Sequence, residues 1–413
     1  MAALRARDVL VLLLLLALPG CAAPTPVTSP EGSVGETLHG IIPHAAEVVL
    51  VGAGGEGEAH LATSPSGVLL ACGNGGMKGP SPTWISRDGR NWTSVSILGV
   101  PPASGCDVAA GPQGSLYVAY ASAGGIVVAV SRDGGASWVV ATASRVGAPV
   151  RDHPRLLATR DALLVTSESV SGPYALFASR SQDGGQTWTE DTLVAPTILA
   201  TGRAGGPVEA SGSVAVAVRL DGASPGLRLH VLSGLGIWNE KPIDLPGAAV
   251  AGFVPEIAGD AQGRLSLPVP VRRDNGTDVL LLQSDDLGAS WSPAIVPAFQ
   301  NVTLGSPPAL AVDARQDGGL TVAVQNESIQ KTWVVSVARY DPGGSFVAGG
   351  PVGDPPAPPG GAVGSLSVRH DAQGLARIAY PAREFGCGGA TLPGDAGYCV
   401  YLLSERMVVR RPS

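Results

Sequence analysis

Carboxylates at regular intervals are the residues most able to do chemistry in this sequence of 413 residues. An aspartate stands third in SRDGGASW (Ser131–Trp138), SQDGGQTW (Ser181–Trp188), SDDLGASW (Ser284–Trp291) and the shorter SRDGRNW (Ser86–Trp92). Such aspartates could act as general acids or bases, or they could ligate a metal ion. They could instead accept hydrogen bonds from the backbone of a tight turn.

The residues around each aspartate favour the turn. Asp133 can accept hydrogen bonds from N–H groups just after it, and Gly134 and Gly135 allow backbone angles closed to residues with a Cβ. Trp138 begins the returning strand and can bury its ring beneath the turn. Each copy lies between two strand-like runs, where a hairpin turn belongs. We therefore expect structural roles for Asp88, Trp92, Asp133, Trp138, Asp183, Trp188, Asp286 and Trp291.

The motif recurs along the chain. Degenerate copies, SGLGIW and YDPGGSF, occupy Ser233–Trp238 and Tyr340–Phe346. A turn motif repeated about every 50 residues indicates a propeller or a similar repeat architecture. The copies resemble the Asp-boxes of the sialidase-like (BNR-repeat) β-propeller superfamily. The resemblance implies blades of four antiparallel strands, with the Asp-box between the third and fourth strands.

The composition agrees with an all-β chain. The sequence holds 57 Gly and 35 Pro beside an apolar fraction of 45%, which is enough for a core. We expect one propeller domain, because closed repeat folds exceed the usual domain length. The net charge of −7 and the lack of a basic run give no reason to bind nucleic acid or an anionic membrane surface. No motif points to a cofactor or a metal.

We predict seven blades, with six as the alternative because sialidases themselves have six. After the last motif, three further strands are expected at Ser365–His370, Leu375–Tyr380 and Tyr398–Ser404. Their outer partner is either Met407–Arg411 or, from the other end of the chain, Glu47–Val51. Pairing the two ends would close the ring and remove exposed sheet edges.

The first residues are predicted to be an export signal. Arg5 and Arg7 precede an apolar run, which ends in Leu-Pro-Gly-Cys at Cys21. This ending resembles a bacterial lipobox, which implies lipid attachment at Cys21. We divide the chain into a signal peptide (1–21), a Pro/Ala/Thr-rich tether (22–45) and the propeller (46–413). The protein is then exported and held at the cell envelope by its lipid; cleavage by an ordinary signal peptidase, giving a secreted protein, is the alternative.

The four remaining cysteines fit two disulfides in an oxidising compartment. Cys72 ends the second strand of blade 1 and Cys106 begins the first strand of blade 2, so both lie on one face of a propeller. Cys387 and Cys399 flank one loop of blade 7. A metal site of four thiolates is the rival, but no C-x-x-C spacing supports it.

The resemblance implies that a ligand would bind on the face opposite the Asp-boxes. Arginines among carboxylates could bind an acidic sugar there, although polar loop tips are also ordinary solvated surface. The sequence Arg151-Asp152-His153 is the densest cluster, whereas His60, near the N-terminus, is expected to be solvated. The residues expected on this face are Arg151, Asp152, His153, Arg155, Glu209, Arg219, Glu256, Arg272, Arg273, Asp274, Arg383 and Glu384.

Resemblance to sialidases would also imply three arginines that clamp the substrate carboxylate and a Tyr/Glu nucleophile pair. The family's Arg-Ile-Pro segment is missing, so the clamp lacks its first arginine. Glu209 with Arg219 could supply the glutamate and the second arginine, Arg315 or Arg383 the third, and Tyr380 the nucleophile. A two-carboxylate glycosidase could instead draw on Asp152, Glu209, Glu256 and Asp274.

From these observations we expect a non-catalytic, monomeric module that binds a glycan or an envelope protein through its loop face. The ligand candidates are Arg151, Asp152, His153, Glu256, Arg272 and Arg273. The alternative is a sialidase-like exo-glycoside hydrolase with catalytic candidates Asp152, Glu209, Arg219 and Tyr380.

Overall fold

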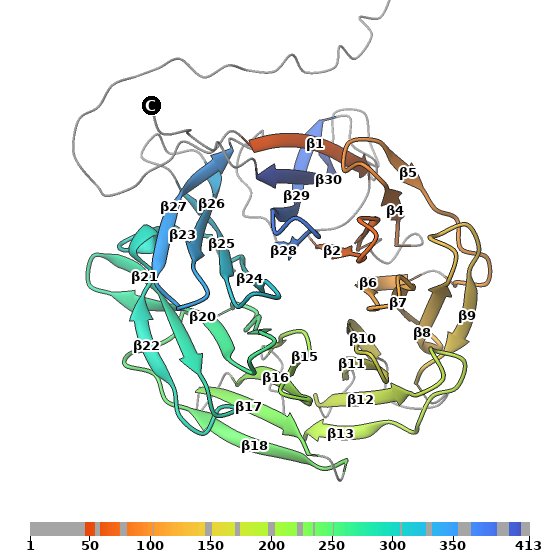
Figure 1. Ribbon diagram of the computed structural model, residues 1–413, viewed down its shortest axis with the longest axis horizontal. Helices are drawn as coiled ribbons and strands as arrows, with labels where there is room; N and C mark the ends of the chain where they lie inside the picture. Colours follow the sequence, from red (N-terminus) through yellow and green to blue (C-terminus); the bar gives the residue numbers. More distant parts are fainter. Residues whose placement is uncertain are drawn as a thin grey trace, which may run out of the picture. The chain divides into compact units, whose positions relative to one another are not determined.

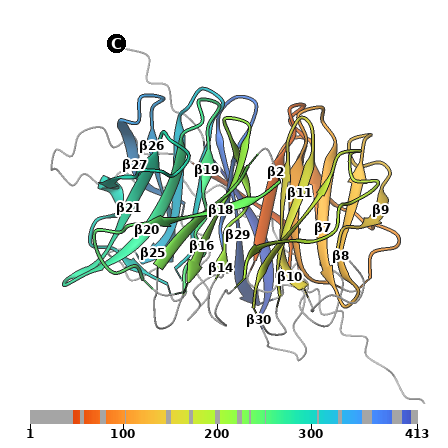
Figure 2. The same ribbon diagram turned by 90° about the horizontal axis from the view of Figure 1, so that it is seen from below.

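Seven small antiparallel sheets stand in a ring (Figure 1), which confirms the predicted seven-bladed β-propeller. Figure 2 shows the strands running between the two faces of the ring. The described part of the chain lies within one compact unit, Gly40–Ser413, and no helix in it could span a membrane. The computed structural model describes residues 46–53, 58–74, 81–101, 103–144, 151–169, 174–196, 203–220, 226–233, 236–250, 252–305, 308–327, 333–353, 365–385 and 396–405.

In each of blades 1 to 4, the strands follow the chain from the inside of the ring outward. Blade 1 contains β2 (Ala59–Thr63), β3 (Leu69–Gly73), β4 (Thr83–Ser86) and β5 (Trp92–Ser94). Blade 2 contains β6 (Ala103–Ala110), β7 (Leu116–Ser122), β8 (Gly125–Ser131) and β9 (Val139–Thr142). Blade 3 contains β10 (Arg151–Ala158), β11 (Leu163–Ser169), β12 (Leu176–Ser181) and β13 (Thr192–Ala195). Blade 4 contains β14 (Arg203–Ala204), β15 (Val208–Ala210), β16 (Ser213–Leu220), β17 (Gly226–Leu232) and β18 (Trp238–Ile243).

Blades 5 and 6 repeat this order, and the inner strand is split in two in blades 4 and 6. Blade 5 contains β19 (Ala258–Gly259), β20 (Leu265–Arg273), β21 (Gly276–Ser284) and β22 (Ser292–Ile295), followed by the short helix η2 (Pro297–Phe299). Blade 6 contains β23 (Thr303–Leu304), β24 (Leu310–Ala314), β25 (Leu320–Glu327), β26 (Trp333–Tyr340) and β27 (Phe346–Gly353).

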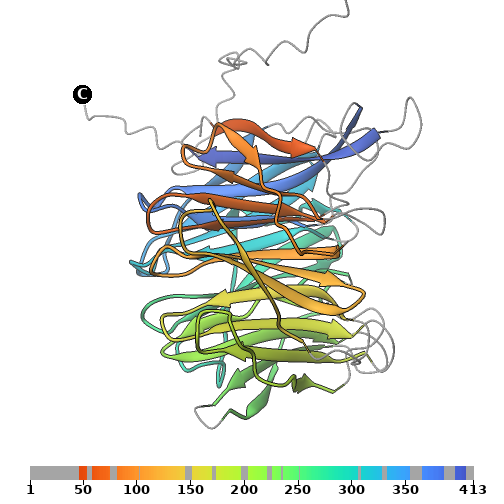
Figure 3. The same ribbon diagram turned by 90° about the vertical axis from the view of Figure 1, so that its right-hand side faces the viewer.

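Blade 7 joins the two ends of the described chain. It contains β28 (Ser367–His370), β29 (Ala376–Phe385) and β30 (Ala396–Glu405), and its outer strand is β1 (Ala46–Ala53). The pairing runs antiparallel from Ala46 opposite Glu405 to Ala53 opposite Cys399. In Figure 3 the red start of the described chain lies beside the blue strands near its end. The predicted closure by Glu47–Val51 is confirmed; the rival strand at 407–411 lies outside the described residues.

The S-x-D-G-G turns are held by hydrogen bonds within each motif. Ser131 Oγ donates to Asp133 Oδ1 over 2.8 Å, and the Ser137 N–H donates to the same oxygen over 2.9 Å. Gly135 has a φ of 92°, and its carbonyl accepts from Trp138 Nε1 at 3.2 Å. Hydrogen bonds from the Ser137 hydroxyl, the Ser137 N–H and Ser131 lower the pKa of Asp133 to about 2. These bonds keep the carboxylate ionised as a fixed acceptor of the turn.

Basic side chains tie each of several turns to the preceding blade. Arg132 of blade 2 donates to the Gly184 carbonyl in the turn of blade 3 over 3.4 Å. Lys241 of blade 4 likewise donates to the Leu287 carbonyl in the turn of blade 5 over 2.8 Å. On this face, therefore, side chains of one blade bind the backbone carbonyls in the turn of the next blade.

Each inner strand is the edge strand of its sheet, so the backbone N–H groups on its open side have no partner strand. Side chains from the preceding blade of the ring accept hydrogen bonds from several of these N–H groups. Ser365 and Ser367 of blade 7 accept from Ala59 and Leu61 of blade 1. Asp107 of blade 2 accepts from the Leu156 N–H of blade 3 over 2.7 Å. Asp313 of blade 6 accepts in the same way from the His370 N–H of blade 7 over 2.8 Å. Carboxylates are thereby fixed on the walls of the ring's centre.

Candidate functional site

The inner strands of the seven blades face the centre of the ring (Figure 1). Residues from all seven blades line a pocket of about 320 Å³ there. Its walls combine backbone and aliphatic side chains with an unusual number of charged groups. Four carboxylates stand there against two guanidinium groups and one imidazole. These residues are His60, Asp107, Arg155, Glu209, Glu256, Asp313 and Arg369.

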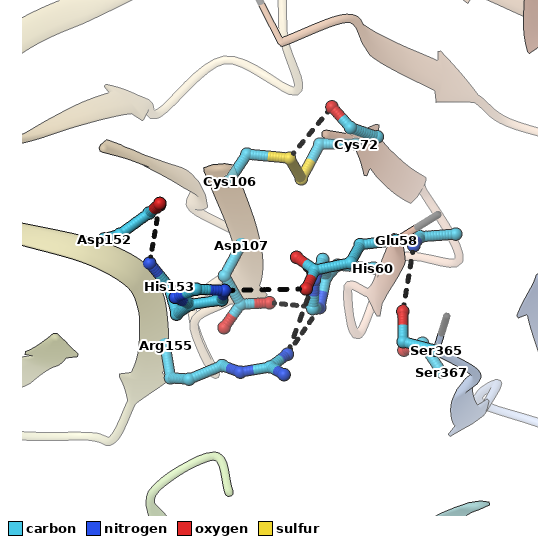
Figure 4. A network of polar contacts seen from close by, with 12 residues as sticks. Glu58, His60, Cys72, Cys106, Asp107, Asp152, His153, Arg155, Ser365 and Ser367 are labelled. Atoms are coloured by element: carbon cyan, nitrogen blue, oxygen red, sulfur yellow. Dashed lines mark hydrogen bonds and ion pairs between the residues drawn. A yellow bond between two sulfur atoms is a disulfide. The ribbon is translucent and has the colours of Figure 1, made fainter. Parts of the chain in front are cut away.

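His60 is the centre of a polar network on the wall made by blades 1 to 3 (Figure 4). Its Nδ1 atom lies 3.2 Å from Asp107 Oδ1 and 2.8 Å from Arg155 Nη1, and its Nε2 atom lies 3.8 Å from Glu58 Oε2. His60 is only 5% exposed. The expected solvated role is therefore wrong: the imidazole alternates with apolar neighbours on β2 and points inward, where partners from two other blades surround it.

Arg155 extends this network across the pocket. Its Nη2 atom lies 3.3 Å from Glu256 Oε1, and Glu256 Oε2 accepts from the Gly206 N–H over 3.3 Å. Burial opposes the charged form of Arg155, but Glu256, Asp107 and Glu58 outweigh burial and raise its pKa. One guanidinium thus links blade 1, through His60, with blade 5, through Glu256.

The two carboxylates beside His60 remain ionised. Burial alone would raise the pKa of Glu58, but a hydrogen bond with His60 and the charges of His153, His60 and Arg155 hold it well below its usual range. The pKa of Asp107 is lowered in the same way, because His60, Arg155 and the Leu156 N–H together outweigh its burial. These groups can accept hydrogen bonds from a ligand but are poorly suited to donate a proton.

His153 approaches the network through a β-bulge. The pairing of β10 with β11 shifts register between Asp152 and Arg155, and His153 has a φ of 49°, in the left-handed region. Asp152 Oδ1 accepts from the His153 N–H over 2.8 Å and from the Ser104 hydroxyl over 3.1 Å, which fixes the bulge. The His153 ring then lies between Glu58 and Glu168, with N···O distances of 3.9 and 3.7 Å. Bulges of this kind commonly re-aim a side chain next to a site.

Arg151, from the same predicted cluster, lies elsewhere. It is 3% exposed, and its Nη2 atom lies 2.9 Å from Asp191 Oδ2. Its guanidinium carbon stands 3.3 Å above the centre of the Phe177 ring. Since the bulge changes the register after Asp152, Arg151 packs within blade 3, whereas His153 lies beside Glu58 and Glu168 and Arg155 lines the pocket.

The residues suggested by resemblance to sialidases do not meet in this pocket. Arg219 is 3% exposed and donates to the Phe253 carbonyl. Tyr380 is 1% exposed and stacks on Tyr401 with 5.7 Å between ring centres. Arg315 pairs with Asp317 in a hairpin turn at 3.0 Å.

The other predicted residues divide between the pocket and the outer loops. Glu209 and Glu256 line the pocket. Arg272, Arg273 and Asp274 are exposed at the tip of the β20–β21 hairpin, where Arg273 lies 3.1 Å from Asp278. The side chains of Arg383 and Glu384 lie outside the described residues.

A disulfide braces the wall that carries the network. Cys72 of β3 and Cys106 of β6 are bonded, with 6.4 Å between their Cα atoms, so this predicted pair is confirmed. Because Cys106 precedes Asp107, the bridge fixes the strand that presents Asp107 to His60 (Figure 4). The other predicted pair cannot be compared, since Cys387 lies outside the described residues. Among the described residues, no group of three His, Cys, Asp or Glu side chains could hold a metal ion.

Sequence comparisons give no relatives: no protein-family profile and no curated protein matches the chain. Structure comparisons do. An ulvan lyase, a polysaccharide lyase bound to -[GlcA(1-4)Rha3S]-, is similar with a TM-score of 0.53 and 12% identity, over 87% of this chain and 97% of the other. A protein of unknown function from Dyadobacter fermentans has a TM-score of 0.50 at 12% identity, over 88% of this chain and all (100%) of the other. A Hadza microbial sialidase has a TM-score of 0.49 at 14% identity, over 83% and 74%. At such identities the likeness shows a shared propeller fold alone.

Proposed function

We propose that the protein binds a saccharide in the pocket on the propeller axis. The observation that carries the proposal is the set of carboxylates and guanidinium groups that converge on one pocket of about 320 Å³. Ligand pockets of roughly 300–1,000 Å³ with a few convergent polar groups are typical of small-molecule sites. Carboxylates such as Glu209 and Glu256 can accept hydrogen bonds from sugar hydroxyls, and guanidinium groups can donate to ring or carboxylate oxygens. The similar ulvan lyase, which holds an acidic glycan, supports this class of ligand.

Binding without catalysis fits the state of the two carboxylates beside His60. A glycosidase acid must keep its proton, which requires a raised pKa. The pKa values of Glu58 and Asp107 are lowered instead. The rival function, a sialidase-like hydrolase, would need an arginine and a tyrosine open to substrate, whereas Arg219 and Tyr380 are buried.

We further propose export, with lipid attachment at Cys21 and a place at the cell envelope; ordinary cleavage and secretion is the alternative. The Cys72–Cys106 disulfide supports export, because disulfides persist in oxidising compartments. Labelling of the expressed chain with a radioactive fatty acid should depend on Cys21, and Cys21→Ser should release the protein into the soluble fraction. Equal labelling of wild type and C21S would contradict this part of the proposal.

The binding proposal is tested with the exported full chain on an array of neutral and uronic-acid oligosaccharides, followed by calorimetry with the strongest binder. Glu256→Gln should weaken binding about tenfold, since hydrogen bonds to a charged group contribute about 1.5–3 kcal/mol. Glu240→Gln is the matched control, because Glu240 also pairs with an arginine, Arg228 at 3.2 Å, but on the outer strand β18. No binding to any saccharide, or equal losses in E256Q and E240Q, would refute the proposal. Steady cleavage of a glycoside would refute its non-catalytic part.

A further inference from the structure

The contacts of His60 make incompatible demands on one nitrogen atom. Arg155 Nη1, a donor that carries no lone pair for hydrogen bonding, lies 2.8 Å from His60 Nδ1. Asp107 Oδ1, an acceptor, lies 3.2 Å from the same atom. An unprotonated Nδ1 accepts from Arg155 and gives Asp107 Oδ1 no hydrogen bond, although Asp107 Oδ2 still accepts from the Leu156 N–H. A protonated Nδ1 donates to Asp107 and can no longer accept from Arg155. The other ring nitrogen, Nε2, lies farther from Arg155 Nη1, at 3.4 Å, and faces the Glu58 carboxylate at 3.8 Å, which favours a proton on Nε2.

The protonation state of His60 therefore decides what holds Arg155. With Nδ1 bare, the guanidinium is bound on one side by His60 and on the other by Glu256 at 3.3 Å. With the ring protonated, the hydrogen bond is lost and two cations face each other. The Nη1 edge of Arg155 is then free to turn toward the pocket that Arg155 lines.

From this geometry, and resting on the proposed saccharide site, we propose that His60 is a proton-controlled latch on Arg155. Its protonation releases the guanidinium to bind the carboxylate of an acidic sugar. A guanidinium with two free N–H groups can hold a carboxylate through parallel hydrogen bonds. The imidazolium also adds a positive charge to a wall crowded with carboxylates. Affinity for a carboxylated sugar should rise on acidification, whereas affinity for a neutral sugar should not.

The charged groups around His60 favour the protonated imidazole. Glu58 faces the ring from the segment before β2, Asp107 from β6 and Arg155 from β10, while blade 7 presents the Ser365 and Ser367 hydroxyls to the backbone of β2. Burial and Arg155 disfavour the charged ring, but Asp107 and Glu58 outweigh them and raise the pKa of His60 above its ordinary value. The ring therefore takes up its proton at a higher pH than an unperturbed histidine does.

The test compares a glucuronic-acid disaccharide with its glucose counterpart, titrated into the exported full chain by calorimetry between pH 5.5 and 8.5. On the alkaline side of the His60 titration, affinity for the acidic probe should rise by up to about tenfold for each unit of pH decrease, because one proton is linked to binding. Affinity for the glucose probe should stay flat. His60→Gln should abolish the slope, since Gln can accept from Arg155 but cannot titrate, and Arg155→Gln should abolish the preference for the acidic probe.

His230→Gln is the matched control, because His230 is a buried histidine (2% exposed) on β17, away from the pocket residues; this variant should keep the wild-type slope.

A measurement without variants covers the case in which H60Q fails to fold. Binding in buffers of different ionisation enthalpy should show uptake of up to one proton with the acidic probe and none with the glucose probe. An acidic probe that binds with flat pH dependence, or an H60Q variant that keeps the slope, would overturn the latch while leaving the saccharide site intact. Failure of both probes and of the array would instead overturn the saccharide site itself.

Discussion

The turns on one face and the pocket on the axis both depend on carboxylates, but their partners lie at very different distances along the chain. Asp133 accepts from Ser131 and Ser137, two and four residues away. Asp107 accepts from Leu156, 49 residues away, and the Arg155–His60 contact spans 95 residues. The first kind of carboxylate shapes one hairpin. The second kind holds blades together, so its loss should reach beyond its own strand.

The largest expected difference is between Asp107→Ala and Asp133→Ala. Asp107→Ala leaves the buried Leu156 N–H without its acceptor and removes one of the carboxylates that offset the charges of His60 and Arg155. Breaking a buried ion pair from one side costs about 3–5 kcal/mol. The same substitution at Asp133 should cost clearly less, because solvent reaches that turn. Urea unfolding of both variants measures the difference, and equal losses would show that the contrast between the two regions is false.

The second largest effect is expected for the Cys72–Cys106 disulfide, which joins blades 1 and 2 covalently. Replacing both cysteines by serine should lower the free energy of unfolding by about 3–4 kcal/mol, as expected for a closed loop of this length, since the cysteines are 34 residues apart. Unfolding of the wild type with and without dithiothreitol provides an independent measurement. A loss below about 1 kcal/mol would mean that the noncovalent contacts alone fix the two blades.

A glycine pair separates strain within a turn from contact between blades. Gly135→Ala should destabilise by about 1–3 kcal/mol, because Gly135 has a φ of 92° and its new Cβ would lie against Ile85 of blade 1. Gly67→Ala is the control, since Gly67 has a φ of 81° but no atom within 4 Å of the added Cβ. G67A should carry the backbone strain alone. Thermal unfolding should therefore show a lower melting temperature for G135A than for G67A. Equal melting temperatures would place the whole effect in the backbone of the turn, and the reverse order would contradict the prediction.

The smallest expected effect is on how the free energy of unfolding depends on pH in acid. Hydrogen bonds from the side chain and N–H of Ser290 and from Ser284 lower the pKa of Asp286 to about 2, against about 3.9 in an unfolded chain. A depressed pKa in the folded state gives stability that is present above the unfolded value and lost as pH falls through the folded value. Unfolding between pH 4 and 2 should therefore depend less steeply on pH in Asp286→Asn than in the wild type. Identical slopes would show that the turn does not prefer the ionised form.

The sequence was informative wherever the structure depends on nearby residues. The S-x-D-G-G-x-x-W motif encloses nearly all the hydrogen bonds of its turn, so its copies marked the third and fourth strands of their blades. The closing strand β1 was predictable because blade 7 needed an outer strand, and a strand-like segment near the start of the propeller had no blade of its own. The Cys72–Cys106 pair followed once both cysteines were placed at strand ends on one face.

The axial site was less predictable, because its contacts connect inner strands of different blades. Neither His60 nor Asp107 belongs to a repeated motif. The only signal in the sequence was a polar residue between two apolar ones, as in Ala59-His60-Leu61 and Cys106-Asp107-Val108. The Asp152–Arg155 bulge was also missed, and it is the reason that Arg151 and His153, two residues apart, occupy different surroundings.

The pairing of β1 with β30 has a consequence for synthesis. Ala46 must wait for Glu405 before their pair can form, a delay on the order of 20–70 s if the chain is made at about 5–20 residues per second. During that time six sheets can assemble in order while the seventh lacks its partner, and a chain cut short before β30 never completes it. Ring closure therefore acts as a test of full-length translation: a premature stop anywhere before β30 leaves an open edge that proteases and chaperones can recognise.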